Sequence, residues 1–245
     1  MSTILNNRKP MLKITLSILL FSLFHISSQA QSFTADLHLG VANIGAVDLT
    51  SLQGYIIENA NLPLKSTDSY PARPQFGLSI LRKKDVSTFV GFHWLYSSTG
   101  GRVAVSDYSG TVTSDQILNT HQLGFSTGQY FKETKLFHPY LGVQLSALLS
   151  NLELKDNGRL TNGEQVSSSS TFVAQNVGLH PMVGFKFDQL PVILKLELGY
   201  LIQVTQFPFH LKENRDATLS INENEVGPGL SGFRGNISFS FDIFK

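Results

Sequence analysis

The sequence predicts an all-β protein, an eight-stranded antiparallel up-and-down barrel whose strands cross a membrane and whose first long loop contains a short helix. Three observations predict it: apolar and polar residues alternate along the strand segments, short and long connections alternate between them, and the N-terminus resembles an export leader. The alternation is clearest near the C-terminus, where Leu194, Leu196 and Leu198 are interleaved with Lys195 and Glu197. A period of two residues places one set on each face of a β-strand.

The N-terminus has the parts of a secretory signal. Positive charge from Arg8, Lys9 and Lys13 precedes an apolar run at 14–26, and Ser28-Gln29-Ala30 offers small residues for cleavage. A transmembrane anchor is the alternative, but the run is shorter than the roughly 20 residues that a spanning helix needs. The predicted domains are a signal peptide at 1–30 and one outer-membrane barrel at 31–245.

Composition excludes several functional classes. The chain has 19 basic and 18 acidic residues, so no basic field favours nucleic acid as a partner. It has no cysteine, which excludes disulfides, thiolate metal sites, a cysteine nucleophile and a lipoprotein anchor. We expect no cofactor and no metal.

The strands are justified by their alternation and by the connections between them. We expect strands at residues 33–44, 75–83, 86–97, 115–131, 139–152, 171–187, 192–205 and 234–245. The connections after the second, fourth and sixth strands are short, whereas those at 45–73, 98–114, 153–170 and 206–230 are long. Outer-membrane barrels have short periplasmic turns and long extracellular loops, and an even strand number leaves both termini in the periplasm.

The two faces of the strands favour a membrane barrel over a soluble, lipocalin-type barrel. A soluble barrel needs many charges on its outer face, but the polar parity here is rich in Gly, Ser, Asn and Gln, and only 15% of the chain is charged. Aromatic residues gather near the strand ends, as interfacial girdles require: Phe33, Trp94, Tyr96, Phe137, Phe187, Phe207, Phe209 and Phe244. The predicted location is the outer membrane.

The long loops are the expected place for function, because binding residues concentrate on loops held by a rigid scaffold. Helical spacing in the first loop is shown by Leu49, Leu52, Ile56 and Ala60. Asp48 or Thr50 is the expected N-cap and Pro63 the stop. This helix is either a lid or partner surface, or a segment packed on the rim to bury its own leucines.

The second loop is expected to extend its two strands as a hairpin above the lipid. Its Arg102, Asp107 and Tyr108 are candidate contacts for a sugar or lipopolysaccharide, by residue type alone. In the third loop, the serines at 167–170 are expected to be a flexible spacer.

An eight-stranded barrel is just wide enough for its own side chains, so we expect a filled lumen and no solute conduction. Six charged or titratable residues should face the periplasmic half of this lumen: Asp36, His38, Lys186, Lys195, Glu197 and Asp242. Buried charges persist only when they are partnered, so we expect a network in which Lys195 lies near Asp242. The network is either a structural plug or a path for protons or ions.

The sequence does not indicate an enzyme. His121 and Ser126 lie on opposite strand faces, and His93 and His180 point into the lumen without a nucleophile on the same rim. The histidines also lack the spacing of metal ligands.

Two stretches carry a family resemblance, namely Tyr-Ser-Ser-Thr-Gly-Gly-Arg-Val at 96–103 and Ser-Asp-Tyr-Ser-Gly at 106–110. With the leader, the hairpins and the aromatic last strand, the chain resembles small eight-stranded outer-membrane barrels of the Bacteroidetes, the PorT-like and OmpX-like group. The resemblance implies fold and membrane, not activity.

The predicted function is therefore that of a monomeric, non-enzymatic barrel that uses its loops for surface interaction or envelope integrity. One alternative, implied by PorT, is an accessory subunit of a secretion or envelope-assembly machine. A further alternative is a narrow channel or carrier for small apolar molecules, which predicts a lateral gap in the wall or a continuous lumen. Expected partners are outer-membrane lipid, lipopolysaccharide, the barrel-assembly machinery and an envelope protein.

Overall fold

The computed structural model describes residues 32–83, 87–132, 136–161, 163–189 and 192–244. The expected signal peptide at 1–30 lies outside these ranges. In chain order, the elements are β1 (Phe33–Ala42), α2 (Val47–Asn59), β2 (Lys65–Ser69), β3 (Arg73–Lys83), β4 (Thr88–Asp107), β5 (Gly110–Tyr130), β6 (His138–Leu160), β7 (Gln165–Phe187), β8 (Ile193–Gln203), β9 (His210–Leu211), β10 (Ser220–Ile221), β11 (Asn224–Glu225) and β12 (Gly232–Phe244).

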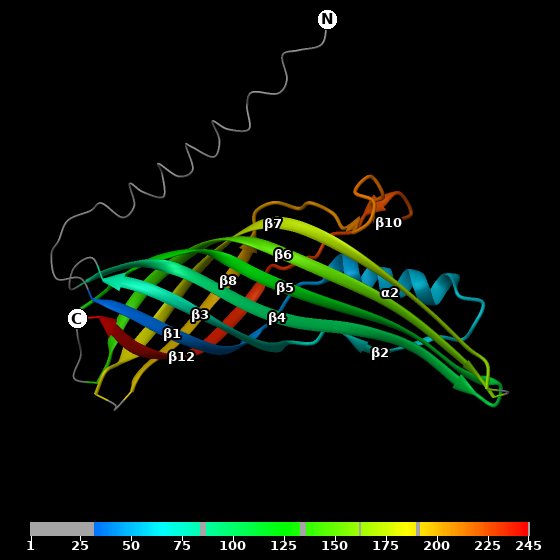
Figure 1. Cartoon of the computed structure of the whole chain (residues 1–245), viewed down its shortest axis with the longest axis horizontal. Coiled ribbons are helices and arrows are strands. Elements are labelled where there is room, and N and C mark those ends of the chain that lie inside the picture. Colours follow the sequence, from blue (N-terminus) through cyan, green and yellow to red (C-terminus); the bar gives the residue numbers. More distant parts are fainter. Residues whose placement is uncertain (1–31, 84–86, 133–135, 162, 190–191, 245) are drawn as a thin grey trace, which may run out of the picture. The chain divides into compact units, whose positions relative to one another are not determined.

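Eight of the strands form a closed antiparallel ring (Figure 1), which confirms the predicted fold class. The order around the ring is β4, β3, β1, β12, β8, β7, β6 and β5, and β5 pairs again with β4. Closure joins the first strand to the last, with Leu37 opposite Phe239. Phe33 and Phe244 pair at the end that also holds the short turns, which we call the short-turn end; the opposite end is the long-loop end.

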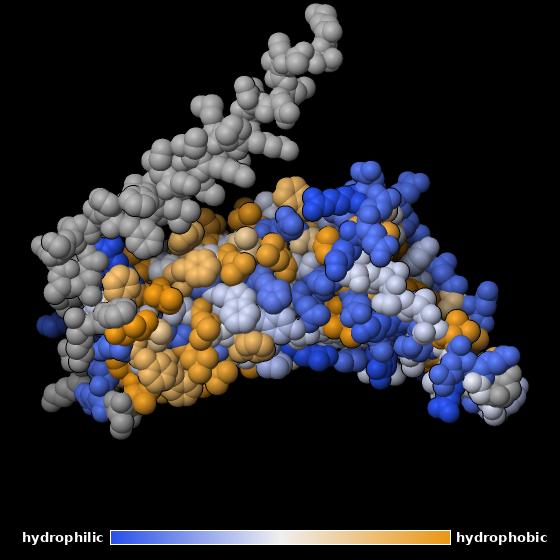
Figure 2. Space-filling view, viewed as in Figure 1, coloured by the Kyte–Doolittle hydropathy of each residue, from blue (hydrophilic) through white to orange (hydrophobic). Residues whose placement is uncertain are grey.

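The apolar parity of the strands faces outward, as the alternation predicts. Each strand of the ring contributes bulky apolar side chains that are more than a third exposed, for example Leu37, Leu78, Phe92, Phe125, Leu145, Val183, Leu198 and Ile237. Figure 2 shows this apolar belt over the half of the molecule nearest the short turns, with hydrophilic residues beyond it. Soluble monomers rarely expose a continuous apolar surface of this kind, whereas a lipid-facing wall requires it.

Four strands continue past the apolar belt at the long-loop end and form a twisted sheet (Figure 1). We call this extension the paddle; it comprises residues 98–107, 110–119, 151–160 and 165–173, and β2 pairs along β4 at one edge. The expected hairpin of the second loop is confirmed, because Asp107 pairs with Gly110 at its tip.

The main error of the sequence prediction concerns residues 153–170, which were expected to form the third long loop. Most of residues 153–170 belong to β6 and β7, and the expected spacer is a strand in which Ser167 pairs with Asn157 and Ser170 with Leu154. The neighbouring β5 already extends to this height, so β6 and then β7 complete a backbone ladder that outweighs the local polarity of the serines.

The helix expected in the first loop is present as α2, which lies against the inner face of the paddle (Figure 1). Neither expected cap is correct: Ala46 occupies the N-cap, Thr50 bonds back to the Ala46 carbonyl at 3.0 Å, and Asp48 instead accepts the Gly227 N–H at 3.1 Å. The helix also ends at Asn59, before Pro63. Tertiary contacts with the last long loop therefore set its start, and not a local side-chain cap.

Candidate functional site

The end of the lumen nearest the short turns contains buried charges that contact one another. Lys195 donates to Asp36 at 2.6 Å, and both side chains are almost fully buried. Glu197 accepts from the Tyr140 hydroxyl at 2.6 Å and lies 3.6 Å from His38. Each expected residue in this group thus has a partner, which is the condition for charge to persist in a low-dielectric interior.

The other two residues of the expected network lie elsewhere. Lys195 pairs with Asp36 and not with Asp242, which is exposed at the end of β12 and stands opposite Thr34. Lys186 is at the rim, where its ammonium bonds to Asp188 at 3.0 Å. Burial opposes ionisation of Asp188, but the hydrogen bond and charge of Lys186 and the neighbouring His138 outweigh it and hold the pKa of Asp188 below its usual value.

A layer of neutral polar side chains follows toward the long-loop end. His93 contacts the Ser146 hydroxyl at 2.9 Å, and His180 Nδ1 contacts the Gln144 amide oxygen at 3.1 Å. Gln122 joins the two, since its amide donates to Ser146 and Gln144. Both histidines face the lumen, as expected from their parity. A cavity beside the ion pairs has a volume of about 10 Å³, which is room for about one water molecule.

The long-loop end of the lumen is filled by an apolar cluster, which we call the plug. Barrel strands and loops both contribute to it: Ala46, Leu49, Leu52, Tyr70, Leu118, Leu148, Leu152, Ala174, Leu201, Phe209, Val226 and Leu230. Leu49 on α2 is 0% exposed. Of the two interpretations of the helix, burial of its own leucines is what this packing supports.

Of the three candidate contacts of the second loop, two form hydrogen bonds within the protein. Arg102 forms an ion pair with Asp115, and this hydrogen bond raises the pKa of Arg102. Asp107 caps its own turn by accepting from Ser109 and Gly110, and the bond from the Ser109 hydroxyl lowers the pKa of Asp107. Tyr108 is 95% exposed at the tip.

One edge of the paddle is open. Within the described residues, β7 pairs only with β6 over 165–170. On its other side, β7 first pairs with another strand at Phe172, which lies opposite Leu211 of β9. The Thr171 carbonyl accepts the Lys212 N–H on this outer side at 2.9 Å. Backbone groups alternate sides along a strand, so the N–H groups of Ser167 and Ser169 point to the open edge.

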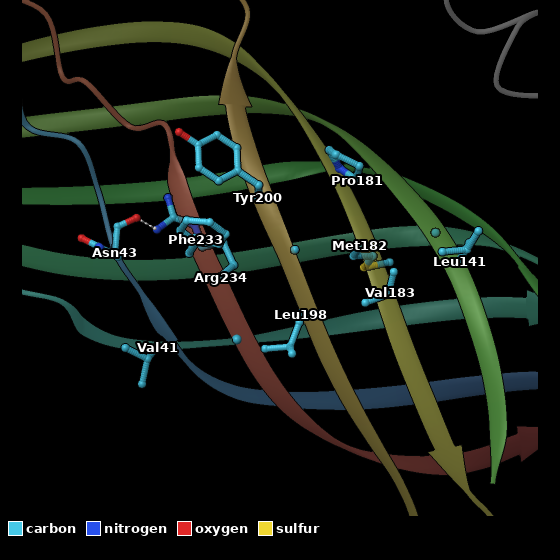
Figure 3. A pocket seen from close by; sticks show the side chains of 13 residues that line it. Val41, Asn43, Leu141, Pro181, Met182, Val183, Leu198, Tyr200, Phe233 and Arg234 are labelled. Carbon is cyan, nitrogen blue, oxygen red and sulfur yellow. Dashed lines mark hydrogen bonds between the residues drawn. The ribbon is translucent and has the colours of Figure 1, made fainter.

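A groove of about 770 Å³ lies on the barrel wall across β6, β7, β8, β12 and β1 (Figure 3). Its lining is almost entirely apolar and includes Leu141, Val183 and Leu198 together with the aromatic rings of Tyr200 and Phe233. Those two rings meet edge to face at 5.0 Å. Asn43 and Arg234 are the polar exceptions.

Pro181 interrupts the wall at this groove. The β7–β8 register pairs Leu179 with Ile202 and resumes only at Met182 with Gly199. The Val177 carbonyl accepts from Val204 on the β8 side, so residue 181 should donate to β8 as well, but proline has no N–H. Sequence reasoning missed the groove, although a proline within a strand pattern is a recognised sign of an interrupted ladder.

The fold and its surface define a class of protein, a closed eight-stranded antiparallel barrel with an apolar outer belt. In the described ranges, no helix combines the length and hydropathy needed to cross a membrane. Across the same residues, no group of three or more His, Cys, Asp or Glu is arranged to hold a metal ion.

The comparisons with known proteins assign no family. No family model matches the chain, and no curated protein matches it. Among solved structures, the chain is similar to Neisserial surface protein A at 16% identity and a TM-score of 0.40, over 86% of this chain and 95% of that one. The outer membrane protein OprG of Pseudomonas aeruginosa is 13% identical with a TM-score of 0.44, and the match covers 86% of this chain and 96% of OprG. The attachment invasion locus protein of Yersinia pestis, solved with the heparin analogue sucrose octasulfate, is 12% identical with a TM-score of 0.31. That match covers 87% of this chain and 100% of the other.

Proposed function

We propose that this chain is an integral outer-membrane barrel that holds a rigid β-sheet outside the cell and binds a surface partner through the open edge of that sheet. Both termini are periplasmic in this proposal, so that the short-turn end faces the periplasm. Lipid and lipopolysaccharide surround the belt, and the barrel-assembly machinery inserts the chain. The role is binding, without catalysis.

The observation that carries the proposal is the unprotected strand at residues 165–170. Proteins usually protect an edge strand with lysine, proline, a bulge or a covering loop, because free N–H and C=O groups pair readily with another chain. Here the sequence is Gln-Val-Ser-Ser-Ser-Ser, with no charge and no proline. An extended segment of a partner can add to such an edge as a further strand.

The interior supports a holding role over a conducting one. The plug, the polar layer with His93 and His180, and the ion pairs follow one another along the lumen. The cavity beside the ion pairs has a volume of only about 10 Å³. We expect no stable single-channel conductance from the purified protein in planar bilayers. Steady, reproducible steps of current would contradict a filled lumen and favour the channel alternative.

The test blocks the edge without changing its side-chain size much. Ser169→Pro removes the N–H that points to the open edge, while Ser169→Ala keeps it and serves as the matched control. Both variants leave the hydrogen bonds between β7 and β6 intact, because the N–H and C=O groups of residue 169 point to the open edge and not to β6. A photoreactive amino acid placed at Val166, which is 75% exposed, would report partner contact on intact cells and in native envelopes.

Crosslinks that persist in Ser169→Ala and disappear in Ser169→Pro would support edge pairing. Equal crosslinking in both variants would refute it. A crosslinked product from another envelope protein of the same cell, retained after gentle extraction, would favour the accessory-subunit alternative over binding of an external partner.

A further inference from the structure

The small cavity beside the ion pairs of the lumen is lined by three residues that each carry a buried polar atom without a partner. Asp36, Ser126 and Glu197 line this cavity and are 1%, 3% and 6% exposed. Within the described residues, Asp36 Oδ1, Ser126 Oγ and Glu197 Oε2 are buried and make no hydrogen bond. Buried polar atoms in folded proteins nearly always have a partner, so three such atoms around one cavity indicate a bound molecule.

The ion pairs use only one oxygen of each carboxylate. Asp36 Oδ2 accepts from the Lys195 ammonium at 2.6 Å. Glu197 Oε1 accepts from the Tyr140 hydroxyl at 2.6 Å, whereas Glu197 Oε2 lies 3.6 Å from His38 Nδ1, which is beyond hydrogen-bond distance. Each carboxylate therefore keeps one unsatisfied acceptor.

We propose that the cavity binds one water molecule, which donates to Asp36 Oδ1 and Glu197 Oε2 and accepts from the Ser126 hydroxyl. An ionised carboxylate can only accept hydrogen bonds, whereas a serine hydroxyl can donate one. The bound molecule must therefore offer two donors and one acceptor within a volume of about 10 Å³, and water meets both conditions. Three hydrogen bonds are also the usual number for a buried water. This site lies inside the barrel and does not depend on the function proposed for the paddle edge.

The water closes a ring of polar contacts around the two ion pairs. On one side, the pairs are already linked through Ser79, whose hydroxyl donates to Asp36 at 3.4 Å and contacts His38 at 2.9 Å. On the other side, the water bridges Asp36 to Glu197. Each carboxylate is then held from two directions, and loss of the water would leave a buried acceptor unpaired on both.

Oxidation by hydroxyl radicals tests the site, because X-rays split a bound water where it lies and the radical oxidises the side chains beside it. Phe89 and Tyr140 line the cavity and are both 2% exposed, so radicals from bulk water reach them poorly. Phe209 of the plug is 0% exposed and serves as the matched control for a buried ring away from the cavity. The folded protein in lipid nanodiscs is irradiated briefly, and oxidised residues are identified by mass spectrometry.

We expect Phe89 and Tyr140 to be oxidised and Phe209 to stay unmodified. Ser126→Val fills the cavity and removes the hydroxyl that holds the water, so both oxidations should be lost. Its matched control is Ser150→Val, the same exchange at a buried serine of β6 that does not line the cavity, and it should leave both oxidations unchanged. Ser126→Thr adds a single methyl group and keeps the hydroxyl. It covers the case in which Ser126→Val fails to fold, and it should also remove the labelling.

Three results would overturn the proposal. The first is a wild-type protein in which Phe89 and Tyr140 stay as unmodified as Phe209, and this result needs no variant. The second is oxidation that persists in folded Ser126→Val, because the radicals then come from bulk water. The third is labelling that appears only after sodium chloride is replaced by choline chloride, which would assign the cavity to a sodium ion and not to water.

Discussion

Breaking the buried ion pair of the lumen is the sharpest test of how the barrel is held together. Lys195→Met keeps a similar volume but leaves Asp36, which is 1% exposed, as a carboxylate whose remaining bond is from Ser79 at 3.4 Å. Removing one partner of a buried pair costs about 3–5 kcal/mol, because the other charge is left uncompensated. We expect the free energy of unfolding to fall by that amount.

The measurement is urea unfolding of the protein folded into lipid vesicles, followed by the fluorescence of Trp94, the only tryptophan. The double variant Lys195→Met with Asp36→Asn removes both charges and should recover most of the lost stability, because a neutral pair has no unpaired ion. A single variant within about 1 kcal/mol of wild type, or a double variant as unstable as the single one, would refute this account of the lumen.

Two further predictions address the plug and the short-turn rim. Leu49→Ala should cost about 2–5 kcal/mol in the plug and make residues 45–70 sensitive to protease while the barrel stays folded; if cleavage is unchanged, the helix is not held by this leucine. Asp188 has a lowered pKa in the folded protein, so its ion pairs contribute stability above its ordinary pKa of about 4 and lose it as pH falls through the lowered value. Asp188→Asn should abolish that part of the acid dependence and cost no more than about 1 kcal/mol at neutral pH, measured by urea unfolding at a series of pH values.

The outward face of the barrel was predictable because it depends only on the pleat of each strand. Leu196 and Leu198 face outward and Lys195 and Glu197 face inward in any barrel that puts apolar residues toward lipid. No knowledge of neighbouring strands is needed for that inference, and the ring confirms it.

The partners inside the lumen were not predictable in the same way. Lys195 was expected near Asp242 because β8 and β12 are adjacent, but it reaches across β12 to Asp36 on β1. Which residues meet depends on the stagger of the strands around the closed ring, and alternation does not determine stagger. The prediction of the N-cap of α2 was wrong for a related reason, because Asp48 accepts a hydrogen bond from Gly227, which is distant in the sequence.

The plug links the barrel strands to α2 and to the last long loop. It combines Leu118, Leu148 and Leu152 of the barrel with Leu49 and Leu52 of α2 and with Phe209 of the last long loop. From α2, Gln53 donates to the Asp68 carbonyl at 2.7 Å and thereby ties the helix to β2 at the paddle edge. Displacing the paddle would therefore open apolar contacts inside the barrel. Gln53 thus holds the β2 edge of the paddle, whereas the open β7 edge lies on the opposite side and is held by its ladder to β6. In the binding mode proposed above, a strand fixed in this way loses little conformational freedom when a partner adds to it, and such preorganisation favours affinity.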